Sequence, residues 1–130
     1  MIRKTILAVI VISSILMLLS ACSGGTKSAA VAVEDYIRAL VAKDAARLSA
    51  LSCADWEQMA QTELDSFQAV QVRLDGLACS VIGNEGSTTL VTCQGKIIAS
   101  YNNEDQTIDL SVRTYQVVHQ GGDYLVCGYR

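Results

Sequence analysis

The apolar residues change their spacing once along the chain, close to Ala69. Before this point they recur every three or four residues, as on one face of a helix. After it they alternate with polar residues, as in a strand with one buried face. Helices followed by strands predict an α+β domain, in which the helices pack on one face of an antiparallel sheet. The chain contains no proline, and its 130 residues are enough for one such domain.

Three helices are predicted in the first half of the chain. The first covers residues 28–43 and carries an apolar stripe made of Val33, Ile37, Leu40 and Val41. The second is short, covers residues 45–52, and has Asp44 placed to cap its start. For the third, we expect Asp55 to be the N-cap, with Gln58 in the capping-box position. Its stripe is interrupted by Glu63 and consists of Trp56, Met59, Ala60, Leu64 and Phe67.

Four strands are predicted after the helices, over residues 69–81, 87–101, 107–119 and 124–129. Inside the first strand, the apolar residues move to the other face after Asp75-Gly76. Such a change at a glycine indicates a β-bulge, which bends the sheet. Short turns separate the strands, so the sheet is expected to be a curved four-stranded antiparallel meander.

The stretch from Val33 to Leu48 resembles the beginning of nuclear transport factor 2-like and cystatin-like domains. In those domains a helix ends in a corner like Ala42-Lys43-Asp44 here, and a short second helix follows. The resemblance covers residues 29–130 and implies a cone with an apolar pocket between sheet and helices. Some members are isomerases or dehydratases with an acid or base inside the cone. Many others bind a small molecule or another protein, so the fold alone does not define the function.

The amino terminus has the three parts of a secretory signal. Arg3 and Lys4 precede an apolar run, and small residues precede Cys22. The run over residues 5–19 is 15 residues long, whereas a membrane-spanning helix needs about 20. Leu19-Ser20-Ala21-Cys22 also resembles the lipobox of bacterial lipoproteins. The resemblance implies cleavage before Cys22, acylation of its thiol, and a lipid anchor on the extracytoplasmic side of the membrane, facing the periplasm or the cell surface.

The chain therefore divides into a signal peptide (1–21), a lipidated cysteine with a flexible tether (22–28), and a single domain (29–130). Loss of the signal removes Arg3 and Lys4, so Lys and Arg fall from 10 to 8 against 13 acidic residues, giving −5. An acidic domain of this kind does not favour nucleic acid as a partner. The expected partners are membrane lipid, through acylated Cys22, and an envelope protein or a small apolar ligand.

Four cysteines remain in the domain: Cys53, Cys79, Cys93 and Cys127. An even number in a short exported domain indicates two disulfides, with three pairings open. A two-residue turn at Asn84-Glu85 would set Cys79 opposite Leu90. A three-residue loop centred on Gly86 would set Cys79 opposite Cys93, leaving Cys53 to pair with Cys127. We favour the second register. No paired spacing typical of a zinc site is present.

No residue stands out as catalytic, and no metal or cofactor is expected. His119 is the only histidine and lies beside a two-glycine turn, so we expect it to be exposed. Asp75 and Asp109 alternate with apolar residues and are expected to face solvent, as are the pairs Glu34-Asp35 and Glu104-Asp105. Packing is the expected role of the strand tyrosines: Tyr101, Tyr115, Tyr124 and Tyr129.

The sequence favours a noncatalytic binding or interaction module, with a small isomerase or dehydratase as the alternative. A ligand binder predicts a closed apolar cavity of at least about 300 Å³. An interaction module predicts a filled core and exposed apolar residues. An enzyme predicts a titratable group inside the cone.

Overall fold

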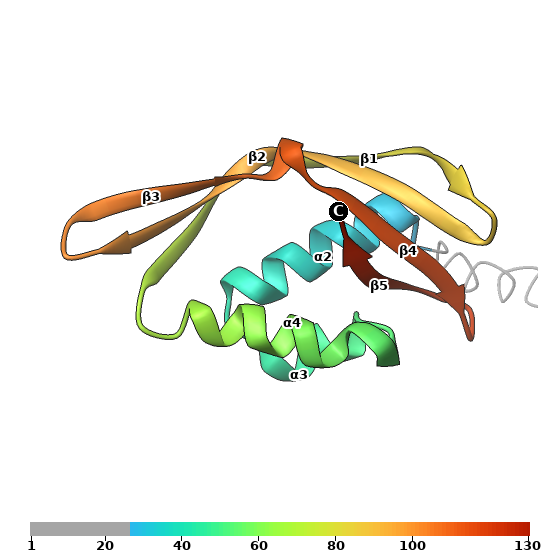
Figure 1. Cartoon of the computed structure of the whole chain (residues 1–130), viewed down its shortest axis with the longest axis horizontal. Coiled ribbons are helices and arrows are strands. Elements are labelled where there is room, and N and C mark those ends of the chain that lie inside the picture. The colour runs from blue at the N-terminus through green and yellow to red at the C-terminus, as the bar shows by residue number, and fades with distance from the viewer. Residues whose placement is uncertain (1–26) are drawn as a thin grey trace, which may run out of the picture.

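The structure is a computed structural model that describes residues 27–130, so Cys22 and the predicted signal lie outside the described residues. Helices α2 (Ala29–Val41), α3 (Ala45–Ala50) and α4 (Ala54–Ser66) lie on one side of a long curved sheet (Figure 1). The predicted α+β architecture is confirmed. Along this part of the chain, no helix is both long enough and apolar enough to cross a membrane.

Local side-chain hydrogen bonds begin the first two helices. Ser28 Oγ accepts a hydrogen bond from the Val31 amide at 3.2 Å at the start of α2. Asp44 caps α3, as predicted, by accepting from the Arg47 amide at 3.0 Å. The apolar stripe of α2 is buried at Val33, Ile37 and Leu40. The capping side chains and the stripe together fix the corner between α2 and α3.

The start of α4 differs from the prediction. Its N-cap is Cys53, which makes no side-chain cap, while Asp55 lies within the first turn. The Cys53 amide donates to the Val126 carbonyl at 2.9 Å, so a long-range backbone contact sets where the helix begins. Met59 was also predicted wrongly, because its side chain is 55% exposed. Consecutive helix residues point about 100° apart, so Met59 points in a different direction from its neighbour Ala60, which is fully buried.

The sheet has five strands rather than four. Their order is β1-β2-β4-β5, with β3 paired to the second half of β2. The strands are β1 (Gln71–Glu85), β2 (Thr88–Tyr101), β3 (Glu104–Asp109), β4 (Thr114–Gln120) and β5 (Asp123–Tyr129).

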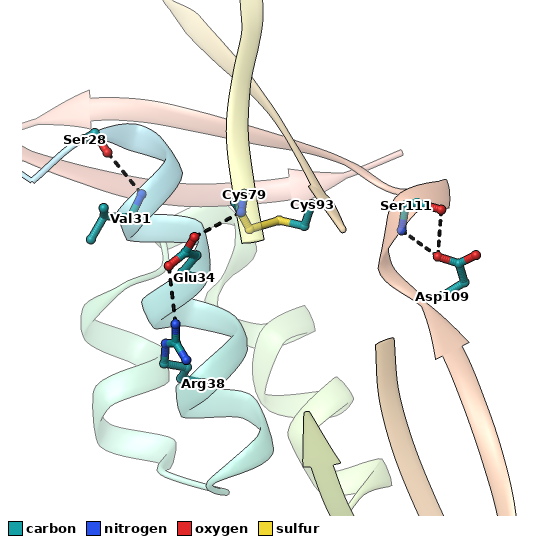
Figure 2. The surroundings of a disulfide bond; sticks show 8 residues. All are labelled: Ser28, Val31, Glu34, Arg38, Cys79, Cys93, Asp109 and Ser111. Atoms are coloured by element: carbon teal, nitrogen blue, oxygen red, sulfur yellow. Dashed lines mark hydrogen bonds and ion pairs between the residues drawn. A yellow bond between two sulfur atoms is a disulfide. The ribbon is translucent and has the colours of Figure 1, made fainter. Parts of the chain in front are cut away.

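The predicted strand 107–119 is interrupted by a short 3₁₀ helix, η1 (Leu110–Val112). Asp109 Oδ1 accepts hydrogen bonds from the Ser111 amide at 2.8 Å and Ser111 Oγ at 2.7 Å (Figure 2). These bonds offer the backbone an alternative to the strand ladder. Val112, predicted to face inward, is 74% exposed as a result.

β1 pairs along one edge of β2, and the interruption divides the other edge between two strands. Residues 88–92 pair with β4, and residues 96–101 pair with β3. The β2–β3 hairpin reaches beyond the helices as an arm (Figure 1). Its tip is the turn Asn102-Asn103, with φ of 50° and 63°. Asparagine is favoured at both central positions of a two-residue hairpin turn of this kind.

The predicted β-bulge in β1 is confirmed. Pairing passes from Asp75 with Lys96 to Ala78 with Gln94, so two residues of β1 lie opposite Gly95 alone. A Cβ atom on Gly95 would lie 2.5 Å from the Asp75 carbonyl oxygen. The close backbone approach at the bulge therefore requires glycine on β2.

Replacing Gly95 by alanine is expected to lower the free energy of unfolding by about 3 kcal/mol, through this overlap and its φ of +97°. Gly121→Ala is the matched control, since its φ is +60° but its surroundings are open. The control is expected to cost about 1 kcal/mol. Urea unfolding of both variants measures the difference, and equal losses would show that the overlap is relieved by a small backbone shift.

Side chains from both layers form one core beneath the sheet. The largest fully buried side chains come from all three helices and from β2, η1, β4 and β5: Val33, Tyr36, Ile37, Leu40, Leu48, Leu64, Val91, Ile97, Leu110, Tyr115, Val117 and Val126. This core occupies the position at which the resemblance implied an apolar pocket.

Candidate functional site

The four cysteines of the domain form two disulfides in the structure. Cys79 is bonded to Cys93 with a Cα–Cα distance of 4.0 Å, and Cys53 to Cys127 with 5.2 Å. These are the pairs that the favoured register brings together, but the register has another origin. Glu85 pairs with Thr88, so the turn has two residues, and a shift between Val81 and Gly83 supplies the extra residue in β1. The three-residue loop centred on Gly86 was therefore wrong.

Glu34 joins the first of these disulfides to helix α2. Its Oε1 accepts a hydrogen bond from the Cys79 amide at 3.0 Å, and its Oε2 lies 3.4 Å from Arg38 Nη2 (Figure 2). β1 is an edge strand, so this bond occupies one amide on its open side. Glu34 was expected to face solvent, and this was wrong because its carboxylate connects the helix to the sheet edge.

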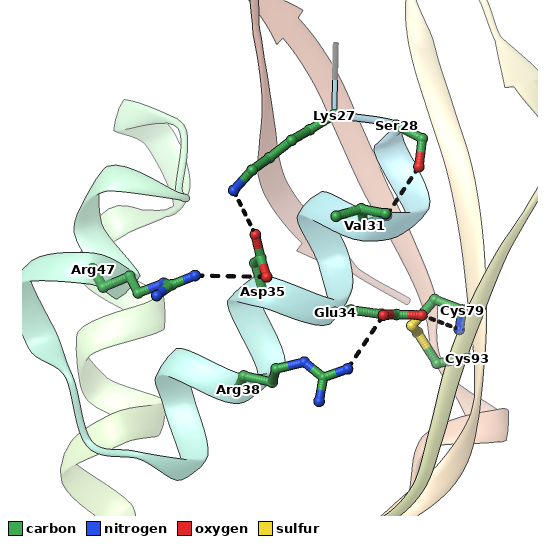
Figure 3. A network of polar contacts seen from close by, with 9 residues as sticks. All are labelled: Lys27, Ser28, Val31, Glu34, Asp35, Arg38, Arg47, Cys79 and Cys93. Atoms are coloured by element: carbon green, nitrogen blue, oxygen red, sulfur yellow. Dashed lines mark hydrogen bonds and ion pairs between the residues drawn. A yellow bond between two sulfur atoms is a disulfide. The ribbon is translucent and has the colours of Figure 1, made fainter. Parts of the chain in front are cut away.

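Asp35, the neighbour of Glu34, connects two other parts of the domain. Lys27 Nζ lies 2.8 Å and Arg47 Nη2 lies 3.6 Å from its carboxylate, and both side chains point toward it (Figure 3). The Asp35 side chain is 16% exposed, whereas its partners are more than half exposed. The solvent-facing expectation was wrong here too, since Asp35 holds α2, α3 and the start of the domain together.

The second disulfide ties the start of α4 to β5. Beside it, Ser52 forms an isolated parallel bridge with Val126. The Val126 amide donates to the Leu51 carbonyl at 2.8 Å. The α3–α4 connection is therefore fixed to the last strand by backbone hydrogen bonds and a covalent bond.

A polar cluster lies inside the cone, between α4 and the sheet. Glu63 Oε1 accepts hydrogen bonds from Arg113 Nη1 at 2.9 Å and from the Tyr129 hydroxyl at 3.3 Å. The Glu63 and Arg113 side chains are only 14% and 17% exposed. Glu63 Oε2 is buried and has no hydrogen-bond partner among the described residues. The negative charge of Glu63 is therefore balanced within the protein by the Arg113 guanidinium.

Aromatic rings surround the ion pair. The Arg113 guanidinium lies 4.1 Å from the centre of the Tyr129 ring, in cation–π geometry. Tyr129 makes edge contacts at 5.5 Å with both Trp56 and Tyr115. Trp56 Nε1 donates to the Tyr36 hydroxyl at 3.0 Å. We call Tyr36, Trp56, Tyr115 and Tyr129 the aromatic cluster.

Burial raises the pKa of Tyr115 to about 12, and it raises the pKa of Tyr36 still further above the ordinary value. Both hydroxyls therefore keep their protons at neutral pH and serve as hydrogen-bond donors or acceptors, not as bases. The chemistry of the interior is that of a closed polar network attached to a packed core.

Sequence reasoning missed both members of this ion pair as a site. Glu63 was noted only as an interruption of an apolar stripe, and Arg113 was not singled out. The sole signal was an acidic residue on a buried helix face, which calls for a cation from elsewhere in the fold. The residues that were singled out lie apart: His119, Asp75 and Asp109 are exposed, and the His119 ring packs 4.6 Å from Tyr124. Within residues 27–130, no group of three or more metal-binding side chains could hold an ion.

Open hollows lie on the surface formed by residues 27–130. One of about 740 Å³ is formed by Lys43, residues 68–71, residues 100–103 and Asp105. We call it the distal hollow, because it lies beside the arm, away from the start of α2 (Figure 1). A second hollow of about 340 Å³ lies at the bulge beside Gly76 and Gly95. A third, of about 160 Å³, lies between α2 and α3 beside Ala42.

Neither a protein-family model nor a curated protein sequence matches the chain. Solved structures do resemble it. A SEC-C motif-containing protein from Rhodopseudomonas palustris superposes with a TM-score of 0.53 at 13% identity, over 80% of each chain. A proposed ketosteroid isomerase from Shewanella frigidimarina gives 0.53 at 13% identity, over 81% of this chain and 95% of its own.

The protein Aln2 from a Streptomyces species gives a TM-score of 0.52 at 12% identity, over 75% of this chain and 82% of its own. Identities this low carry information about architecture only. The described domain has the α+β fold of nuclear transport factor 2-like proteins.

Proposed function

We propose that this chain is a lipid-anchored, extracytoplasmic binding module that is not an enzyme, held beside the membrane by acylated Cys22. The observation that carries the noncatalytic part is the ion pair between Glu63 and Arg113 at 2.9 Å. A catalytic base on this fold needs a free carboxylate, histidine or hydroxyl facing a substrate. Here the interior carboxylate is bonded to an arginine and covered by the aromatic cluster.

The packed core supports the same proposal. A small ligand inside the cone would have to replace side chains such as Tyr36, Tyr115 and Leu64, all of which are at most 1% exposed. Displacing them would cost the contacts that stabilise the domain. We therefore assign the binding role to the outer surface of the domain, where a partner contacts it.

The anchoring part rests on the sequence and on chain length. Cys22 precedes Ala29, the first residue of α2, by seven residues. Seven residues span at most about 25 Å when fully extended. An acylated Cys22 would keep the start of α2 close to the bilayer, and two or more acyl chains are enough for stable attachment.

Substitution of Cys22 by alanine tests the anchor. In cells fed radiolabelled palmitate, the wild type is expected to be labelled and to sediment with membranes. The Cys22→Ala variant is expected to carry no label and to accumulate as an unprocessed precursor. Of the five cysteines in the sequence, Cys22 is the one that belongs to neither disulfide. Continued labelling of the variant would contradict a lipid anchor at this residue.

One observation favours an enzyme as the second candidate: Glu63 Oε2 is buried without a partner among residues 27–130. A substrate that donates a hydrogen bond to this oxygen would need an opening into the cone. Titration with the apolar dye 1-anilinonaphthalene-8-sulfonate separates the two candidates. An enzyme with an apolar pocket would bind one dye per native molecule, with Glu63→Gln changing the affinity, whereas the proposed module would not bind it.

A further inference from the structure

The distal hollow brings together three segments that are far apart in the sequence. Lys43 follows the end of α2, residues 68–70 lie between α4 and β1 with Gln71 as the first residue of β1, and residues 100–103 form the end of the arm. Its volume of about 740 Å³ lies in the range of small-molecule sites. It is open to solvent along the overhanging arm, so a ligand longer than the hollow could extend out of it.

Its two charged residues are already used within the protein. Lys43 Nζ donates to the Val70 carbonyl at 2.7 Å and lies 3.4 Å from the Gln68 carbonyl. Asp105 accepts hydrogen bonds from Ser100 Oγ and from Arg73 Nη2, the latter at 2.9 Å. These hydrogen bonds, led by that of Ser100, lower the pKa of Asp105, so it stays an acceptor. One cation and one anion, each occupied, favour a neutral ligand.

The remaining polar side-chain groups of the hollow are the Tyr101 hydroxyl and four primary amides, on Gln68, Gln71, Asn102 and Asn103. None of these four side chains forms a hydrogen bond with another residue in the described range 27–130. Each amide offers two donors and one acceptor oxygen in a plane. Turn geometry accounts for asparagine at the arm tip, but it does not account for Gln68 on the facing loop or for Gln71 at the start of β1.

Tyr101 supplies an exposed ring beside these amides. Tyr101 is 61% exposed and is the one tyrosine among the large exposed apolar residues of the described range. In the register of β2 it shares a face with Ile97 and Ala99, which pack toward the helices. The ring therefore lies on the underside of the arm and lines the hollow. An exposed ring next to free amides offers an apolar face and hydrogen bonds to the same ligand.

We propose that the distal hollow binds a neutral saccharide, with one sugar ring stacked on Tyr101 and its hydroxyl or N-acetyl groups hydrogen-bonded to the amides. A sugar ring has an apolar C–H face and a rim of hydroxyls, which matches this lining. The proposal rests on the proposed function and names the ligand class of the binding module.

The position of the hollow indicates which saccharide is in reach. Helix α2 begins at the end nearest Cys22 and ends next to Lys43, and its 13 residues span about 20 Å. The start of α2 and the tip of the arm lie at opposite ends of the domain (Figure 1). With Cys22 acylated, the attachment point lies next to the start of α2 in the sequence, and the hollow lies at the other end of this helix. This placement favours a glycan of the cell envelope over a lipid headgroup of the anchoring membrane.

Calorimetry tests the proposal with the full mature protein purified from membranes in detergent. The probe is tetra-N-acetylchitotetraose, with maltotetraose as a second neutral saccharide and tetraalanine as a peptide. Wild type is expected to bind at least one saccharide, and Tyr101→Ala to weaken that binding by about tenfold. Tyr101→Phe keeps the ring face and is expected to stay within about twofold. His119→Ala, at another exposed ring far from the hollow, is the control and should change nothing.

A second variant keeps the proposal testable if Tyr101→Ala does not fold. Asn102→Gly with Asn103→Gly removes two amides, retains the positive φ of the turn, and is expected to weaken saccharide binding. Three results would overturn the proposal: no heat with either saccharide at 10 mM (a chosen upper concentration, about a hundredfold above a 0.1 mM Kd), unchanged binding in both variants, or binding of the peptide alone. Acylation of Cys22 is measured separately, so a missing anchor and missing saccharide binding are distinct failures.

Discussion

Replacing Cys53 and Cys127 together by alanine is expected to lower the free energy of unfolding by about 4.5 kcal/mol. The bond closes a loop with a sequence separation of 74 residues, so its loss gives the unfolded chain much more freedom. It also releases the N-cap residue of α4 from β5, next to backbone hydrogen bonds at 2.8 Å and 2.9 Å. The measurement is urea unfolding at neutral pH, followed by circular dichroism.

The double substitution of Cys79 and Cys93 is the matched control. Its loop has a separation of only 14 residues, for which about 3 kcal/mol is expected. The two strands also stay paired through the β1–β2 register on both sides of the bond. Equal losses in the two double variants, or a loss below about 1 kcal/mol for Cys53 and Cys127, would contradict loop closure as the main contribution.

Arg113→Met is expected to lower the free energy of unfolding by about 3 kcal/mol, because it leaves the Glu63 carboxylate without its cation in the interior. Both side chains are less than a fifth exposed, so solvent screens the unpaired charge weakly. Glu63 Oε2 already lacks a partner among the described residues, so only the 3.3 Å hydrogen bond from the neutral Tyr129 hydroxyl to Oε1 remains. Urea unfolding again measures the loss.

The companion variant Glu63→Leu with Arg113→Met replaces both charges by apolar groups of similar size. It is expected to recover most of the stability, since burying the ion pair itself costs desolvation energy. A double-mutant cycle should then give a coupling of about 2 kcal/mol or more between the two residues. Additive losses would mean that Glu63 and Arg113 contribute independently, and the interior carboxylate would then be available for other chemistry.

Local patterns explain why much of the fold could be predicted. The change of period near Ala69, the Asp44 cap and the glycine at the bulge all act within a few residues of their effect. The break at Asp109 is also local, through its bonds to Ser111, but the alternation of Leu110 and Val112 concealed it. An aspartate two residues before a serine was the signal to follow.

The sites were harder to predict because they depend on residues distant in the sequence. Arg113 and Glu63 are separated by 50 positions, and nothing in either segment identifies the other. Glu34 meets the Cys79 amide across 45 positions. The distal hollow is lined by Lys43, by residues 68–71 and by the tip of the arm, which are far apart in the sequence. Sequence periodicity reports which face of an element is buried, but not which elements meet.

The intact mass of the mature protein, extracted from membranes without reducing agent, is the most direct test of an anchored, disulfide-stabilised module. We expect the mass of residues 22–130, increased by a diacylglycerol group and any further acyl chain. We also expect the loss of four hydrogen atoms, two for each disulfide. A mass that retains residues 1–21, lacks lipid, or shows thiols open to alkylation in the native protein would contradict this account.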